Sequence, residues 1–241
     1  NPPEYNGVKI FGRGGNKLVD ADEEAIEALL GSAPAAQPGR IERLDDGAAQ
    51  YVAIALARFG GGDGSLAGLA IGLDCANGAY SAIAPDVLAR LGARVTTVGA
   101  APDGSNINVG CGATDLDLLA RTVREGGLDL GIAFDGDGDR MLAVTGAGDP
   151  VDGDQIVAVL APFLGVDQVA VTVMSNLGLH RFLGEQGITV HTTDVGDRYV
   201  LERLRETGGE LGAEQSGHII VLRNHVTGDG LAAALLLCRA L

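Results

Sequence analysis

The sequence has few aromatic residues and few cysteines. Among its 241 residues there is no Trp, 4% of the residues are aromatic, and the three cysteines are Cys75, Cys111 and Cys238. These are too few and too scattered for a disulfide framework or a zinc site, so we expect a reducing, cytoplasmic setting. Because aromatic rings are scarce, Ala, Val, Leu and Ile must fill the core, which is typical of helices packed on parallel strands.

Basic residues are also scarce. The chain has 17 Lys and Arg residues against 32 Asp and Glu residues, which gives a formal net charge of −15. A charge of this sign disfavours binding to nucleic acid and to anionic membrane surfaces. It does not exclude an anionic substrate, because a bound cation and a few local Arg or Lys residues can reverse the potential inside a cleft. We therefore expect no nucleic-acid partner.

Long hydrophobic runs are the third feature that the sequence lacks. No apolar run approaches the ~20 residues that a transmembrane helix needs, so no membrane partner is expected. The first residues show no signal peptide, and Asn1-Pro2-Pro3 is typical of the middle of a loop. Hydrophobic residues still make up 46% of the chain. That is enough apolar mass for hydrophobic cores, and we expect two or three compact units.

Segments with strand and helix patterns alternate along most of the chain. The expected strands are Val8–Phe11, Leu69–Cys75, Arg94–Val98, Leu128–Phe134, Met141–Val144, Val169–Met174, Thr189–Thr193 and Ile219–Leu222. The expected helices are one that begins at Asp20, then Ala48–Phe59, Ser81–Leu91, Asp115–Glu125, Ile156–Leu164, Leu179–Gln186, Tyr199–Glu206 and Asp229–Leu241. The alternation predicts right-handed βαβ units. We expect an α/β fold with two consecutive domains of mixed or parallel sheet, 45–150 and 151–241, after the remnant of a preceding domain, 1–44.

An acidic loop, Asp135-Gly136-Asp137-Gly138-Asp139-Arg140, directly follows one of the expected strands. Carboxylates are hard oxygen ligands suited to Mg²⁺ or Ca²⁺. The intervening glycines allow the backbone to turn so that the three side chains converge. Without a cation the clustered carboxylates would raise one another's pKa. Since ligands of open α/β sheets gather at the carboxyl ends of strands, the loop predicts a divalent cation site.

Two other interpretations of this loop are a solvated acidic turn and an EF-hand. An EF-hand requires Gly at loop position six and Glu at position twelve. Here those positions hold Arg140 and Gly146, so the EF-hand pattern fails twice. An Arg directly after the third Asp suits a metal that lies next to a phosphate.

The acidic loop resembles the metal loop of the α-D-phosphohexomutase superfamily. Other stretches, in the same order along the chain, resemble its phosphoglucosamine mutase branch. They are Asn1-Pro2, Asn6–Lys9, Leu73–Ala79, Asn106–Asn108, Val173–Leu179, Val195–Val200, Glu214–His218 and Thr227–Gly230. Members have four domains around a central cleft, which carry in turn a phosphorylated Ser in a segment ending Ser-His-Asn-Pro, the metal loop, the sugar-recognition loops and a phosphate-binding site.

The resemblance implies how the chain is divided. Residues 1–44 would be the tail of the first domain, with Asn1-Pro2 ending the Ser-His-Asn-Pro segment, 45–150 the second domain and 151–241 the third. The phosphoserine and the fourth domain are then expected before Asn1 and after Leu241. The implied activity is a Mg²⁺-assisted, phosphoserine-mediated transfer between the 6- and 1-positions of a phosphorylated hexosamine, with a homodimer as one assembly to test. The alternatives are a sister activity on glucose or mannose phosphates, and a non-catalytic fragment that binds a metal.

The resemblance also implies the roles of individual residues. Asp135, Asp137 and Asp139 would ligate Mg²⁺, Arg140 would contact the transferring phosphate, and Lys9 would exchange a proton with the sugar hydroxyl. Contacts to the sugar are expected from Glu214, Ser216, His218 and Asp197. The first three alternate in sequence, so they would share one face of an extended segment. Plainer interpretations are a solvated Lys9, a structural His218, and an Asp197 that caps the following helix.

Overall fold

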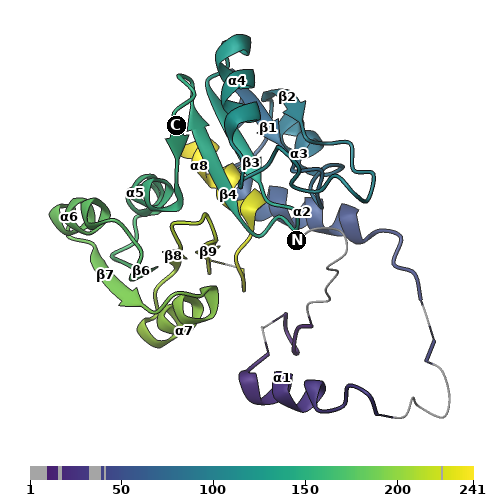
Figure 1. Ribbon diagram of the computed structural model, residues 1–241. Helices are drawn as coiled ribbons and strands as arrows, with labels where there is room; N and C mark the ends of the chain where they lie inside the picture. The colour runs from purple at the N-terminus through teal and green to yellow at the C-terminus, as the bar shows by residue number, and fades with distance from the viewer. Residues whose placement is uncertain (1–9, 16–17, 33–38, 41, 224) are drawn as a thin grey trace.

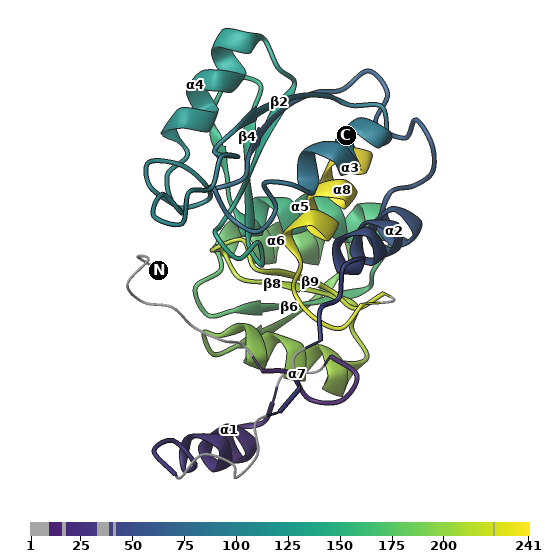
Figure 2. The same ribbon diagram turned by 90° about the vertical axis from the view of Figure 1, so that its right-hand side faces the viewer.

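The structure, a computed structural model, describes residues 10–15, 18–32, 39–40, 42–223 and 225–241 (Figure 1). Its first helices are α1 (Asp20–Glu27) and α2 (Gly47–Phe59). α1 stands apart from the rest of the molecule (Figure 2), whereas α2 packs against the hydrophobic core. The start of α1 is where the sequence predicts it, whereas half of the expected strand Val8–Phe11 lies outside the described residues.

The first sheet has the strand order β2-β1-β3-β4-β5. β2, β1 and β3 run parallel, and β4 and β5 are antiparallel to their neighbours. α4 covers one face, while α2, α3 and a later helix cover the other. The bounds are β1 (Ala70–Asp74), α3 (Ala84–Arg90), β2 (Arg94–Val98), α4 (Asp117–Gly126), β3 (Leu130–Phe134), β4 (Met141–Thr145) and β5 (Pro150–Val151). β1 and β3 are buried along their whole length, as expected of strands covered on both faces.

The second sheet has the order β7-β6-β8-β9, with only β9 antiparallel to its neighbour. Helices α5 and α6 contact one face and α7 the other (Figure 1). The bounds are α5 (Gly153–Leu164), β6 (Gln168–Thr172), α6 (Leu177–Glu185), β7 (Thr189–Thr193), α7 (Asp197–Thr207), β8 (Leu211–Ala213) and β9 (Ile219–Val221).

The last helix, α8 (Gly230–Ala240), joins the two sheets. Gly230–Cys238 are all buried, and the helix packs on α2 and β4 as well as on α5 and β9. One hydrophobic core therefore contains both Ile71 of β1 and Val169 of β6. The Arg239 guanidinium donates a hydrogen bond to Phe59 O (2.8 Å) and fixes the far end of α8 to α2. This shared core holds the two sheets in one arrangement, although the domain boundaries 45–150 and 151–241 remain a prediction.

The fold class is confirmed: two consecutive α/β units with mixed sheets follow a short leading segment. Two strands were missing from the sequence prediction. β5 lies between the expected strand Met141–Val144 and the expected helix Ile156–Leu164, and β8 contains Gly212; both strands are too short to show an alternation. Among the described residues no helix has the length and apolar character needed to cross a membrane.

Candidate functional site

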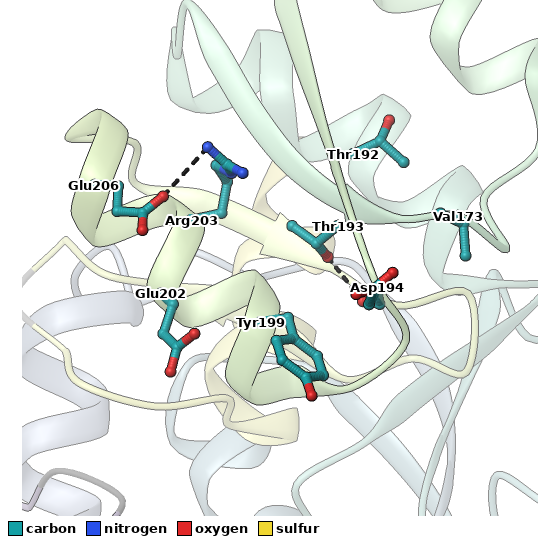
Figure 3. A pocket seen from close by; sticks show the side chains of 8 residues that line it. All are labelled: Val173, Thr192, Thr193, Asp194, Tyr199, Glu202, Arg203 and Glu206. Atoms are coloured by element: carbon teal, nitrogen blue, oxygen red, sulfur yellow. Dashed lines mark hydrogen bonds and ion pairs between the residues drawn. The ribbon is translucent and has the colours of Figure 1, made fainter. Parts of the chain in front are cut away.

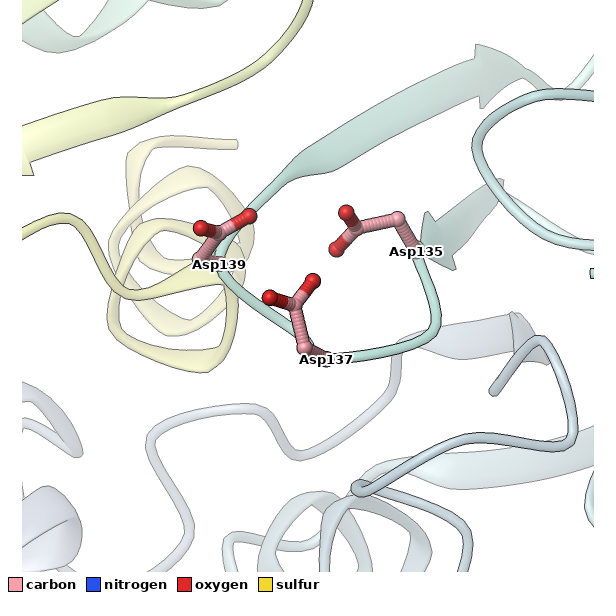
Figure 4. A group of neighbouring side chains, drawn as sticks. All are labelled: Asp135, Asp137 and Asp139. Carbon is pink, nitrogen blue, oxygen red and sulfur yellow. The ribbon is translucent and has the colours of Figure 1, made fainter. Parts of the chain in front are cut away.

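The acidic loop connects β3 to β4 at the carboxyl end of β3. In β3 and the parallel β1, Ala133 lies beside Asp74, so the two strands end at the same edge of the sheet. The side chains of Asp135, Asp137 and Asp139 point toward one another (Figure 4), and each offers an oxygen within 4.8 Å of the others. Three converging carboxylates at this edge form a candidate metal centre.

The backbone of the loop is tightly constrained. The amides of Gly138 and Arg140 both donate to Asp135 Oδ1, each at 3.1 Å. Gly138 has a φ of +78°, a conformation that favours glycine. A Cβ at Gly136 would lie 2.6 Å from the Cδ1 atom of Ile107. The glycines predicted from spacing alone are therefore required both by a backbone angle and by close neighbours.

The three carboxylates of the loop repel one another. Asp135 is buried, with 8% of its surface exposed. Burial raises the pKa of Asp135 to about 6, the nearby Asp139 and Asp137 add to this rise, and the Arg140 amide opposes it. Arg140 Nε lies 3.7 Å from Asp135 Oδ2 and 3.9 Å from Asp139 Oδ1. Its guanidinium, which is half exposed, balances part of the negative charge.

The predicted sugar-binding segment 214–218 connects β8 to β9. It is a turn, because the Gly217 amide donates to Glu214 O (3.0 Å) and the flanking strands are antiparallel. Ser216 is exposed and His218 is buried. The expectation of one shared face on an extended segment is therefore wrong, since a turn breaks the alternation of side chains.

The same segment contacts both the acidic loop and a second loop. Gly217 O accepts from the amide of Met141, the first residue of β4 (2.9 Å). Glu214 Oε1 accepts from the Gly196 amide (3.0 Å), just before α7. These bonds bring the segments around residues 140, 196 and 214–218 together, although they are far apart in the sequence.

His218 lies at the centre of this arrangement. Its Nδ1 atom is 3.7 Å from Asp139 Oδ2, and its Nε2 atom is 3.4 Å from Asp197 Oδ2. Asp197 is the first residue of α7, and the N-cap position is Gly196, so the alternative of a capping Asp197 is wrong. The structure thus joins seven predicted residues directly or through one neighbour: Asp135, Asp137, Asp139, Arg140, Asp197, Glu214 and His218.

Two predicted residues, Lys9 and Ser216, are not among these seven. Lys9 lies outside the described residues. Ser216 is the exposed member of the turn at 214–218. The roles of all nine candidate residues remain predictions, whereas the proximity of the seven joined residues is a property of the structure.

A separate cavity of about 300 Å³ lies between the end of β7 and α7 (Figure 3). Its lining includes Thr193, whose hydroxyl donates to Asp194 O, and the ion pair of Arg203 with Glu206 (3.2 Å). None of the candidate site residues lines it. This cavity therefore adds nothing to the metal centre.

Sequence reasoning missed three residues that lie behind the acidic loop. Asp229 accepts hydrogen bonds from Tyr51 and Tyr80, and Tyr51 is separated from it by 178 residues. An Asp before an apolar run does signal a helix N-cap, and Asp229 is the N-cap of α8. No local pattern could indicate the two phenols, because their contacts with Asp229 are long-range.

Two family models match the chain. The model described as phosphoglucomutase/phosphomannomutase, alpha/beta/alpha domain II, matches residues 52–148, and the model of domain III matches residues 152–241. Together they span most of the sequence. The chain belongs to the phosphoglucomutase/phosphomannomutase family.

Relatives carry a more specific name. The chain is 51% identical over 248 residues to the phosphoglucosamine mutase of Granulibacter bethesdensis, an alignment that covers 98% of this chain and 54% of that protein. It is 49% identical over 247 residues to the phosphoglucosamine mutase of Rhodococcus erythropolis, with 98% and 55% covered. The chain thus spans about half the length of the curated relatives it matches.

Solved structures share the fold. A phosphoglucomutase/phosphomannomutase family protein of Burkholderia thailandensis superimposes with a TM-score of 0.79 at 23% identity, over 93% of this chain and 50% of that one. The N-acetylphosphoglucosamine mutase of Aspergillus fumigatus, in complex with GlcNAc-6P and magnesium, gives 0.62 at 18% identity over 83% and 48%. At these identities the likeness concerns the fold alone.

Proposed function

We propose that the complete protein is a phosphoglucosamine mutase, which interconverts glucosamine 6-phosphate and glucosamine 1-phosphate. The observation that carries this proposal is the position of His218 between Asp139 of the acidic loop and Asp197 of the second sheet. It supports a cation site and a sugar site that lie side by side. Relatives named phosphoglucosamine mutase, at about half identity over nearly the whole chain, support the choice of sugar.

The acidic loop fits Mg²⁺. Asp135, Asp137 and Asp139 would hold the ion, because their oxygens are hard ligands that already converge within 4.8 Å. The raised pKa of Asp135 means that ionising this buried loop costs free energy, which a bound cation offsets. When bound, Mg²⁺ supplies positive charge beside the transferring phosphoryl group. The fungal structure in complex with GlcNAc-6P and magnesium supports this cofactor and a phosphosugar as partner molecule.

The other candidate residues would hold the substrate. Arg140 has a half-exposed guanidinium that can reach a phosphate at the loop. The exposed hydroxyl of Ser216 and the carboxylate of Glu214, which the Gly196 amide orients, can bond sugar hydroxyls. His218 and Asp197 would complete this contact surface. Lys9, outside the described residues, would exchange a proton with the reacting hydroxyl.

The reaction then has two transfers. A phosphoserine in a part of the complete protein that precedes this chain donates its phosphoryl group to a sugar hydroxyl, which gives a bisphosphorylated sugar. The sugar reorients, and its other phosphate returns to the Ser. Glu214 and Ser216 would hold the sugar in both orientations, while Arg140 stays with the phosphate at the loop. We place the complete protein in the cytoplasm, with a homodimer as its assembly to test.

A coupled assay on the complete protein tests the activity. Equal concentrations of glucosamine 6-phosphate, glucose 6-phosphate and mannose 6-phosphate are supplied in turn, and turnover is expected to be fastest with the hexosamine. Faster turnover of either of the other two sugars would assign the sister activity, phosphoglucomutase or phosphomannomutase. Mg²⁺ binding without turnover of any of the three would favour a non-catalytic metal-binding protein.

Asp137→Asn tests the metal assignment in the same assay. Activity should fall at least about a hundred-fold, because the ion loses a ligand and the transferring phosphate loses its counter-charge. Asp149→Asn, an exposed substitution near the β4–β5 turn, is the matched control and should leave activity unchanged. Full activity in Asp137→Asn would refute the metal role of the loop.

A further inference from the structure

A cluster of polar side chains around the buried Asp229 lies next to the acidic loop, and its other three members are partly buried. We call it the Asp229 cluster, and it consists of Tyr51, Tyr80, His225 and Asp229. Tyr80 Oη donates to Asp229 Oδ1 (2.9 Å), and Tyr51 Oη donates to Asp229 Oδ2 (2.9 Å). The two phenol oxygens are 2.8 Å apart, and His225 Nε2 lies 3.3 Å from Asp229 Oδ2. The cluster draws side chains from α2, the segment before α3, and the segment that leads into α8.

The cluster is a fixed hydrogen-bonded unit. Burial raises the pKa of both phenols, and the charge of Asp229 raises it further, so Tyr51 and Tyr80 remain donors. Burial also acts to raise the pKa of Asp229, but His225, the Ala232 amide and the two phenols outweigh it, and this pKa is lowered. A buried carboxylate with this many donors remains ionised and holds its partners in place.

Tyr80 connects the cluster to the acidic loop. Its ring packs edge-to-face on Phe134, the residue before Asp135, with the centroids 4.9 Å apart and the planes at 62°. A Cβ at Gly138 would lie 2.5 Å from Cε2 of Tyr80, so the ring lies against the backbone between Asp137 and Asp139. One residue away, the Ala79 amide donates to Gly136 O (2.9 Å). The segment 79–80 therefore contacts two places in the loop, Gly136 and Gly138, and the strand residue Phe134 just before it.

The first turn of α8 contacts the loop from the other end of the cluster. Asp229 Oδ1 accepts from the Ala232 amide (3.0 Å), which fixes the N-terminus of α8. The next residue, Gly230, donates its amide to Gly138 O (3.0 Å). A Cβ at Gly230 would lie 2.7 Å from Gly138 O, so only Gly allows this approach. Gly138 is held between the Tyr80 ring and Gly230, and both are tied to Asp229.

We propose that Tyr80, anchored by Asp229, is a positioning residue that sets the conformation of the acidic loop and thereby the spacing of its three carboxylates. The inference rests on the proposed metal function of that loop. Tyr80 touches no ligand itself and acts through Gly138 and Phe134. Groups that orient metal ligands in this way contribute strongly to metal affinity.

Tyr51 is the matched control. It donates to the same carboxylate from α2, and its ring stacks on Tyr80 with the centroids 6.1 Å apart. Removal of its hydroxyl takes one donor from Asp229 but leaves the Tyr80 ring, with its own bond to Asp229, against the loop. If the cluster only joined α2 to α8, substitutions at Tyr51 and at Tyr80 would have the same effect on Mn²⁺ affinity and on hydrogen exchange in the loop.

The experiment compares Tyr80→Leu, Tyr80→Phe and Tyr51→Phe in the complete protein. Mn²⁺ affinity is measured by electron paramagnetic resonance, and amide hydrogen exchange is followed for residues 135–140 and, as a reference, 168–172. We expect Tyr80→Leu to bind Mn²⁺ about ten-fold more weakly and Tyr80→Phe about three-fold more weakly, because Phe keeps the ring contact but loses the bond to Asp229. Tyr51→Phe should bind as the unchanged protein does. Exchange should accelerate in 135–140 for the Tyr80 variants alone.

Two results would overturn the positioning role. One is unchanged Mn²⁺ affinity and loop exchange in both Tyr80 variants, and the other is a Tyr51→Phe variant as weak as Tyr80→Leu. If Tyr80→Leu does not fold, Tyr80→Phe decides. If the unchanged protein binds no Mn²⁺, the metal function fails, while the loop exchange still tests whether Tyr80 sets the conformation of the loop.

Discussion

Two buried aspartates on either side of one backbone hydrogen bond have opposite electrostatic environments. Asp135 belongs to the acidic loop, Asp229 to the cluster behind it, and the bond from Gly230 to Gly138 O links their segments. Both are nearly covered, with 8% and 9% of their surfaces exposed. Yet the pKa of Asp135 is raised to about 6 and the pKa of Asp229 is lowered.

The difference comes from the neighbours and not from burial, which acts to raise both pKa values. Asp135 accepts two backbone N–H groups and faces two further carboxylates. Asp229 accepts from two phenols and one amide and lies beside His225. Asp229 is surrounded by donors, whereas Asp135 faces like charges that Arg140 balances only in part and that a bound cation would relieve. The two sites therefore differ both in their hydrogen-bond donors and in the charges that face the carboxylate.

The largest effect is expected at Asp229. Asp229→Ala should lower the free energy of unfolding by about 3 kcal/mol, because the N-cap of α8 is lost and two partly buried phenols lose their acceptor. Urea unfolding followed by far-UV circular dichroism measures this. A loss below about 1 kcal/mol would mean that the Asp229 cluster contributes little to stability. Asp229 would then not be the structural carboxylate that the comparison with Asp135 assumes.

Gly138→Ala tests the contact between the two regions. The substitution imposes a Cβ at a φ of +78° and places it against the Tyr80 ring, so we expect a loss of about 2 kcal/mol and weaker Mn²⁺ binding. Gly208→Ala is the control. It has a similar φ of +72° but open space around it, and it should cost about 1 kcal/mol without any change in metal affinity. Equal Mn²⁺ affinities in the two variants would contradict the close packing of Tyr80 on the loop.

Asp135→Asn should have the opposite sign to any change at Asp229. In the metal-free protein above pH 7, we expect the free energy of unfolding to rise by about 1 kcal/mol, after allowance for solvent screening, because a buried charge beside two others is removed. Mn²⁺ affinity should fall at least about ten-fold. Calorimetry with and without Mn²⁺ measures both. If the metal-free Asp135→Asn variant is less stable than the unchanged protein, repulsion among the three carboxylates does not destabilise the loop.

The smallest effect is the pH dependence of the stability changes caused by Asp135→Asn and by Asp229→Asn. The folded pKa of Asp135 lies above its unfolded value of about 3.9, so the gain from Asp135→Asn should be full above about pH 6 and vanish as the pH falls toward 4. The folded pKa of Asp229 is lowered, so the loss from Asp229→Asn should persist down to about pH 4 and shrink only below it. Urea titrations between pH 3 and 8, with a chelator present, would contradict the comparison if both differences followed the same pH curve.

Much of the fold could be predicted from local pattern. β2 and β7 have the bounds that the alternation predicts, and α2 differs by one residue. The strands β5 and β8 were missed because two or three residues cannot display a period. At the site, Glu214, Ser216 and His218 were recognised as a group, but their shared face was wrong, because the β8–β9 turn depends on antiparallel pairing that the segment does not encode.

The sequence by itself determined the acidic loop and the family, and it predicted a cation site at that loop, since these depend on residue types at fixed spacing within short stretches. Only the tertiary structure decided that α8 lies between the two sheets, that His218 bridges Asp139 and Asp197, and that Tyr51 and Tyr80 meet Asp229 behind the loop. The physical reason is that these contacts join residues far apart in the chain. Their stability comes from burial in a common core, which the local periodicity of the sequence does not indicate.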